Sequence, residues 1–294
     1  MNTNKITVVE TSKLKGSSNV NNQGIIASKN IEITTPVLIN SGQILAEEVI
    51  TANNTSLTNT GKLASNGSIN LNNTSIVNRS SIESTIVNLQ NVFSYDNNTG
   101  IIRGNNITLT SSGNLLLEGK VQGIENLLIS GLDITNNGNI TAQSGSGAIG
   151  IFLNNNSTGV RGDTKLDISG GNIDVQNSVN GVGVYISGGT LTSTTLTTIS
   201  VGTNGIGLYA KNSDINLSDI TLNLNGDNAL GIYFDGVSNF TGAGTFNIDG
   251  KNVVLYNMIS GGVVNANINL GTVTAGSSYI FGSLIDQVGV YTGY

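Results

Sequence analysis

The sequence contains no cysteine, no histidine and no tryptophan, and it has one proline among 294 residues. Without Cys and His, the chain cannot build a Ser-His-Asp or Cys-His nucleophilic site, nor a His- or Cys-based metal site. The absence of disulfides is compatible with secretion, because a repeat fold held together by stacked ladders needs none. Carboxylates carry the only catalytic chemistry that remains open.

Charge is also scarce. Charged residues make up 10% of the chain, whereas an ordinary globular domain has roughly 25%. The net charge of −6 gives no basic surface for nucleic acid or for an anionic membrane. No uninterrupted apolar run approaches the roughly 20 residues of a membrane span. We therefore expect neither nucleic acid nor a membrane to contact this chain.

A short motif, Asn-x-Gly-x-Ile-x-small, returns at intervals of 18 to 20 residues in the first half of the chain. Its Gly position falls at Gly24, Gly42, Gly61, Ser80, Gly100, Gly119 and Gly138. Two residues later comes an aliphatic side chain in every copy: Ile26, Ile44, Leu63, Ile82, Ile102, Val121 and Ile140. Two residues before it come Asn22, Asn40, Asn59, Asn78, Asn98, Leu117 and Asn136. Such regular self-similarity indicates a stack of near-identical structural units.

A unit of about 19 residues is too short for a pair of helices, and its apolar residues alternate with polar ones. The sequence therefore predicts an all-β fold, a single-stranded right-handed parallel β-helix with turns roughly 4.8 Å apart. The aliphatic residues should form one interior column. Asn and Gly should allow left-handed corners, and stacked Asn amides should hydrogen-bond from turn to turn.

The second half follows a longer repeat with the pattern aliphatic, Gly, aliphatic, aromatic. Its aromatic residues are Phe152, Tyr185, Tyr209, Tyr233 and Tyr256, at intervals of 33, 24, 24 and 23 residues. We accordingly predict an N-terminal edge or cap at 1–21, a segment of short turns at 22–144 and a segment of longer turns at 145–294. The parts should form one elongated solenoid.

The five aromatic residues are the best candidate for a binding surface. Strand alternation places Ile206, Leu208 and Ala210 on one face and Gly207 with Tyr209 on the other. Because the aliphatic set must be buried, we expect an outward aromatic ladder with a glycine beside each ring, except at Tyr256, where Val254 takes that position. Such a ladder could bind sugar rings or a protein. Alternatively, the rings only stack on one another and stabilise the solenoid.

A second candidate binding site is Arg161-Gly162-Asp163, which lies inside the enlarged interval between Phe152 and Tyr185. The extra residues have no place in a regular turn, so this tripeptide should lie on an exposed loop. There it could offer a cation and a carboxylate to an integrin. With three Arg, 39 Gly and eleven Asp in the chain, chance alone yields this tripeptide with a probability on the order of one or two per cent, before allowing for the other motifs that one could search for. Many such tripeptides have no function.

The residues at the two ends of the sequence suggest how the chain relates to a longer protein. Met1–Lys5 lacks the apolar core of a signal peptide, and the aromatic repeat begins again at Val288–Tyr291 just before the last residue. We therefore expect a piece of a larger secreted protein. The strands at a cut end of a solenoid should invite self-association through the open edge.

The first half, in stretches such as 59–64 and 136–142, resembles the repeats of filamentous-haemagglutinin-like proteins. The second half, with Asn204-Gly205-Ile206-Gly207-Leu208-Tyr209, is similar to the passenger region of autotransporter adhesins. The resemblance implies a bacterial type V secreted adhesin, displayed at the cell surface or released, and anchored in the outer membrane through regions not present here. Its partner would be a protein or glycan on the host cell.

Two alternatives to an adhesin remain open. The first is a β-helical enzyme that degrades polysaccharides, which needs clustered carboxylates. The eleven Asp residues form no adjacent pair and keep no constant distance from the aromatic residues, so we expect no enzyme, no metal site and no cofactor. The second is a spacer of a larger toxin or autotransporter that binds nothing itself.

Overall fold

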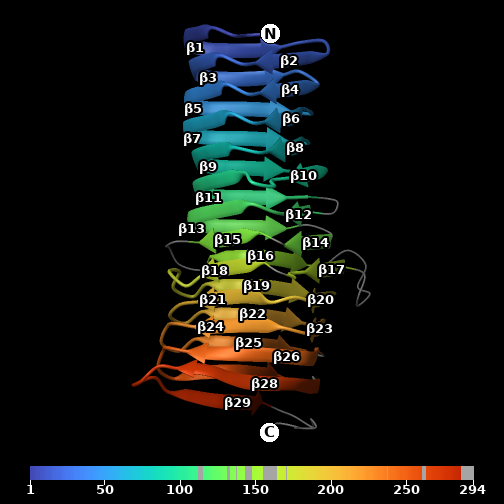
Figure 1. Ribbon diagram of the computed structural model, residues 1–294, viewed down its shortest axis with the longest axis vertical. Helices are drawn as coiled ribbons and strands as arrows, with labels where there is room; N and C mark the ends of the chain where they lie inside the picture. Colours follow the sequence, from blue (N-terminus) through green and yellow to red (C-terminus); the bar gives the residue numbers. More distant parts are fainter. Residues whose placement is uncertain are drawn as a thin grey trace. The chain divides into compact units, whose positions relative to one another are not determined.

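The structure, a computed structural model, describes residues 1–111, 115–130, 133–136, 138–142, 148–154, 164–169, 171–236, 238–259 and 263–285. The described residues form strands and turns without any helix, and parallel strands stack into a β-solenoid of about 12 turns (Figure 1). The predicted all-β parallel β-helix is thus confirmed. The chain divides into two compact units, Met1–Ile124 and Glu125–Tyr294, and each is described by itself below.

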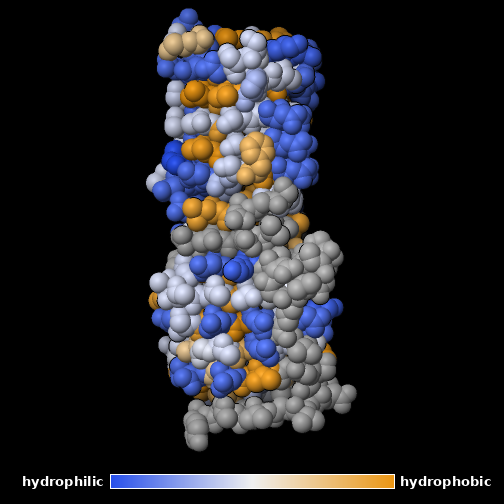
Figure 2. Space-filling model, turned by 90° about the vertical axis from the view of Figure 1, so that its right-hand side faces the viewer, coloured by the Kyte–Doolittle hydropathy of each residue, from blue (hydrophilic) through white to orange (hydrophobic). Residues whose placement is uncertain are grey.

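In unit 1 each turn consists of one long and one short strand. The long strands are β1 (Lys5–Lys15), β3 (Ile25–Thr34), β5 (Gln43–Asn53), β7 (Lys62–Asn72), β9 (Ser81–Gln90) and β11 (Ile101–Thr110). The short strands are β2 (Asn19–Asn22), β4 (Val37–Asn40), β6 (Ser56–Asn59), β8 (Ser75–Asn78), β10 (Ser94–Asp96) and β12 (Leu115–Leu117). Long strands pair with long strands and short strands with short strands, always in parallel. On the side of the short strands, the surface alternates hydrophobic and hydrophilic patches (Figure 2).

The interior of unit 1 contains the predicted aliphatic column. In consecutive turns Ile26 is aligned with Ile44, Ile44 with Leu63, Leu63 with Ile82 and Ile82 with Ile102. All five are buried, as are Val121 and Ile140. The constant spacing and residue class of these side chains therefore correctly identified a buried position. Each turn can bury apolar side chains only against its own interior and its neighbours.

A buried ladder of asparagine side chains runs beside this column. Nδ2 of Asn22, Asn40, Asn59 and Asn78 donates to Oδ1 of the Asn in the next turn across 2.8, 2.7, 2.8 and 2.7 Å. The fifth member is Asn97 and not the expected Asn98. This turn is one residue longer, and Thr99 takes up the extra residue in a left-handed conformation with φ of 63°. The predicted amide ladder exists, with that correction of one position.

One motif glycine, Gly119, adopts the predicted left-handed conformation with φ of 70°, but the first three have a different purpose. Gly24, Gly42 and Gly61 are not among the residues with positive φ. A Cβ on Gly42 would instead collide with the carbonyl oxygen of Gly24, and a Cβ on Gly61 with that of Gly42. Glycine is needed here for close approach of successive turns.

In unit 2 most turns contain three strands. The first strand of each turn belongs to one six-stranded sheet: β16 (Ile149–Asn154), β19 (Val182–Ser187), β22 (Ile206–Lys211), β25 (Leu230–Asp235), β27 (Val253–Ile259) and β29 (Tyr279–Ile285). The other strands are β14 (Asp133–Asn136), β15 (Asn139–Ala142), β17 (Thr164–Asp167), β18 (Asn172–Val175), β20 (Gly189–Ser193), β21 (Thr197–Val201), β23 (Asp214–Leu217), β24 (Ile220–Leu224), β26 (Asn239–Ile248) and β28 (Val263–Val273). Strand β13 (Lys120–Ser130) contains the boundary between the units.

The boundary at Ile124 separates two compact units, whereas the boundary predicted near residue 145 marks a change in the number of residues per turn. The two boundaries therefore need not coincide. Phe152 of β16 pairs directly with Tyr185 of β19, so the enlarged interval between these two residues separates strands that are neighbours in the ladder. At the other end, β1 already pairs with β3 from Lys5 onward. Most of the predicted edge at 1–21 is therefore itself built of solenoid strands.

Candidate binding surface

Four of the five predicted aromatic residues form a continuous stack on the six-stranded sheet. The register aligns Phe152 with Tyr185, Tyr185 with Tyr209, and Tyr209 with Tyr233. The ring centroids lie 4.8, 4.9 and 4.9 Å apart, and all four side chains are half-buried. The spacing of one ring per turn follows from the parallel register, which repeats each outward position at the distance between neighbouring strands.

Tyr256 does not belong to this ladder, and the prediction is wrong at this residue. Its side chain is only 2% exposed and packs edge-on against Phe281 at a centroid distance of 6.3 Å. Tyr256 pairs with Ile232, which faces the core, and Asn257 takes the place next to Tyr233. The aromatic residue comes one position earlier in this turn. The interval of 23 residues and the missing glycine were the signals of that shift.

The glycines of the repeat face the core and not the aromatic ladder, which contradicts the predicted alternation. Gly207 and Leu208 are both buried, whereas Ile206 and Tyr209 are half-exposed. A Cβ on Gly207 would lie 2.7 Å from Cδ2 of Leu222 across the interior. Two successive residues point inward at this place, so strict two-residue alternation fails. Glycine is required because the opposite wall leaves no room for a side chain.

The residues that flank the rings on the outer face are therefore aliphatic. They form a second column of half-buried side chains, one in each turn: Ile149, Val182, Ile206, Leu230 and Val254. Together with Phe152, Tyr185, Tyr209 and Tyr233 they make up what we call the aromatic strip. The sequence did not predict this aliphatic column, because strict strand alternation places residues such as Ile206 in the core.

Stacking limits what the rings can bind. The planes of Phe152 and Tyr185 differ by 14° and those of Tyr185 and Tyr209 by 19°, so these rings cover one another's faces. Only Tyr209 and Tyr233 are tilted, by 44°. A pyranose needs an open ring face to stack on, and the middle of the ladder does not offer one. The ladder presents ring edges beside a column of aliphatic side chains.

One tyrosine hydroxyl in the strip is fixed by a charged neighbour. The Tyr209 hydroxyl donates to Oδ2 of Asp235 across 2.8 Å, and Nζ of Lys211 lies 3.5 Å from the same oxygen. Partial burial, followed by the hydrogen bond to the Asp235 carboxylate, raises the pKa of Tyr209 above its ordinary value. The apolar strip is thus bordered by an ordered polar group, an arrangement suited to directional contact with a partner.

The geometry of the other predicted binding site, the Arg-Gly-Asp tripeptide, is not described by the structure. Arg161, Gly162 and Asp163 lie outside the described residues. Within the described part of the chain, no group of three or more acidic side chains could hold a metal ion, and no helix is long and apolar enough to cross a membrane.

No protein-family model matches the chain, and no curated protein or solved structure is significantly similar to it. Function must therefore be inferred from the residues themselves.

Proposed function

We propose that this chain is part of a bacterial surface adhesin of the autotransporter passenger type, in which the solenoid is the stalk and the aromatic strip contacts a protein on the host cell. The observation that carries the proposal is the strip itself, an ordered apolar surface on the outside of a sheet whose core is already filled. Outward positions of a solenoid need no apolar residues for folding. Four rings and five aliphatic side chains in register therefore point to recognition.

A protein partner fits the strip better than a glycan. Tyrosine is enriched at protein interfaces because it combines a large apolar surface with a hydroxyl. Here the ring edges, the aliphatic column and the fixed Tyr209 hydroxyl are all available, whereas the ring faces of Tyr185 are covered by stacking. The aromatic strip is a continuous apolar surface, and a protein surface of complementary shape can pack against it.

The test is binding of the fluorescently labelled chain to cultured epithelial cells that have been treated in two ways. Protease treatment of the cells should remove most of the binding, and enzymatic removal of surface glycans should leave it nearly unchanged. The opposite pattern would contradict a protein receptor. The same labelled chain, unfolded and mixed with the cells, controls for nonspecific attachment.

A purely structural spacer is the second candidate, and the stacking of the rings favours it. Each stacked pair contributes about 0.5–1.5 kcal/mol to the solenoid even when nothing binds. A spacer should show no saturable binding to any cell type, while replacement of ladder residues should lower its stability. Saturable cell binding would exclude this second candidate.

A further inference from the structure

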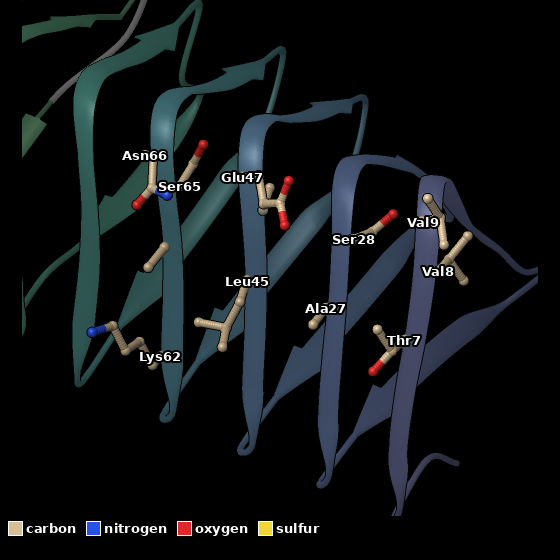
Figure 3. Close-up of a pocket in the computed structure, with 12 residues that line it drawn as sticks. Thr7, Val8, Val9, Ala27, Ser28, Leu45, Glu47, Lys62, Ser65 and Asn66 are labelled. Carbon is tan, nitrogen blue, oxygen red and sulfur yellow. The ribbon is translucent and has the colours of Figure 1, made fainter.

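The outer surface of unit 1 is hollowed where its long strands bend. Two adjoining hollows of about 540 and 370 Å³ share the side chains of Lys62, Ala64, Ser65 and Asn66, so they form one groove. This groove crosses β1, β3, β5, β7, β9 and β11, one strand from each successive turn. Figure 3 shows the first part of it, with side chains from neighbouring strands lying in rows across the turns.

Two rows of outward side chains border the groove. The register aligns the first row from turn to turn: Thr7, Ala27, Leu45, Ala64, Glu83 and Arg103. The second row lies at the bend itself and contains Val9, Glu47, Asn66, Thr85 and Asn105. Between the rows the first turn has Val8, and the later turns have a small residue, such as Ser28, Ala46 or Gly104. The first row begins with small and apolar residues, and the second row is mostly polar.

The bend is held in place by serine hydroxyls. Ser28 donates to the Glu10 carbonyl across 3.1 Å, and Ser65 donates to the Glu48 carbonyl across 2.8 Å. Each bond joins one turn to the turn before it. The groove is therefore preformed, and a ligand would not have to order it on binding.

The charges of the groove do not favour a charged ligand. The lining contains the two cations Lys62 and Arg103 and the two anions Glu47 and Glu83. Lys62 pairs with Glu83 at 3.4 Å, and Nε of Arg103 donates to Oε1 of Gln122 across 3.2 Å. A polyanion or polycation would meet as much repulsion as attraction along this surface.

The distance between successive turns of the groove indicates which kind of uncharged polymer fits it. A chain lying along it meets one side chain of each row once per turn, at intervals of roughly 4.8 Å. An extended peptide advances about 3.3 Å per residue and would lose this register. It also could not add to the sheet as a strand, because the backbone groups of these strands already pair with the neighbouring turns. One pyranose per turn matches the interval closely.

We propose that the groove of unit 1 binds an uncharged linear polysaccharide that lies across the strands with about one sugar per turn. Apolar sugar faces would contact Ala27, Leu45 and Ala64, and the hydroxyl edges would reach Asn66 and Thr85. This site is separate from the aromatic strip and does not depend on the proposed adhesion to a host protein.

The test uses isothermal titration of the whole chain with hexasaccharides of β-1,4-linked glucose, β-1,4-linked N-acetylglucosamine and α-1,4-linked glucose. At least one should bind. Ala64→Leu narrows the groove and is tolerated in this column, because Leu45 occupies the aligned position one turn earlier. It should weaken binding at least about tenfold. The control Thr58→Ile has the same kind of precedent, since Ile39 is aligned with the half-buried Thr58 outside the groove.

Every outcome of the titration bears on the proposal. Binding that is lost in Ala64→Leu and retained in Thr58→Ile supports it, and so does a severalfold loss in Asn66→Ala, which only shortens an exposed side chain. No binding by any of the three hexasaccharides overturns it. Binding of a heparin hexasaccharide or an extended peptide alone also overturns it, as does equal affinity of Ala64→Leu and the unchanged chain. Host-cell binding through the strip would be unaffected in each case.

Discussion

The side-chain amide of Asn59 donates to the side-chain oxygen of Asn78 across 2.8 Å, and both residues are completely buried. The same amide also donates to the Ser81 carbonyl of the next turn across 3.0 Å. Each Asn in the ladder therefore holds two turns together while it satisfies polar groups that are out of reach of water. This device joins the turns of unit 1 without disulfides, alongside ion pairs between turns such as that of Lys13 with Glu32.

Asn59→Ala should destabilise unit 1 by about 2 kcal/mol or more, because it leaves the Asn40 amide and the Asn78 oxygen without their ladder partner. The measurement is denaturant unfolding with an unchanged slope. The matched control is Asn53→Ala, which removes an exposed Asn of the same unit and should change stability by less than about 0.5 kcal/mol. Equal effects of the two variants would refute the structural importance of the ladder.

Gly207→Ala tests the inward orientation of the repeat glycines. We expect unit 2 to lose about 1–3 kcal/mol, because the added methyl would lie 2.6 Å from the Gly231 carbonyl oxygen and 2.7 Å from Leu222. Thermal unfolding followed by circular dichroism measures this loss. If Gly207 faced solvent beside Tyr209, the same substitution would be neutral or slightly stabilising.

Tyr95→Phe should stabilise unit 1 by about 1 kcal/mol. The Tyr95 side chain is 5% exposed, and its hydroxyl has no hydrogen-bond partner among the residues that the structure describes. Removing that hydroxyl removes an unsatisfied polar group and leaves the ring in place. Tyr209→Phe is the control with the opposite expectation, since it deletes the hydrogen bond to Asp235. A loss of stability in Tyr95→Phe would mean that its hydroxyl is satisfied after all.

Alkaline pH should destabilise the protein through the same two tyrosines. Burial raises the pKa of Tyr95 and of Tyr209 above the ordinary value of 10.0, with Asp96 and Asp235 adding to the effect. A raised pKa in the folded state contributes stability that is fully present below the unfolded pKa and is lost as pH rises above it. Unfolding free energies from about pH 8 to pH 11 should therefore fall above about pH 10. The fall should be smaller in Tyr95→Phe.

The sequence predicted the fold because one interior position repeats almost without change, from Ile26 through Ile102. Its errors came from single-residue shifts. The extra residue near Thr99 moved the ladder from Asn98 to Asn97, and the short interval before Tyr256 turned that ring into the core. Spacing alone does not show whether an extra or missing residue lies before or after the position of interest.

The candidate sites were predictable only in part. The aromatic stack follows from the interval between the rings, but the orientation of Gly207 and Ile206 depends on a local failure of strand alternation. The groove of unit 1 depends on a bend that recurs in several turns, and no one residue type marks it: glycine occurs there in β7 and β11, as Gly67 and Gly104, but not near Glu47 of β5. Such bends result from packing between turns, which no single repeat reveals.

The most direct test of the adhesin proposal compares two charge substitutions in unit 2. Ile206→Lys places a charge within the aromatic strip, and Thr221→Lys places the same charge on another outward, half-buried position of the unit. In saturation binding to epithelial cells, Ile206→Lys should bind at least about tenfold more weakly than the unchanged chain, at equal thermal stability, while Thr221→Lys binds normally. Equal cell binding by both variants and the unchanged chain would contradict the assignment of the aromatic strip as the adhesive surface.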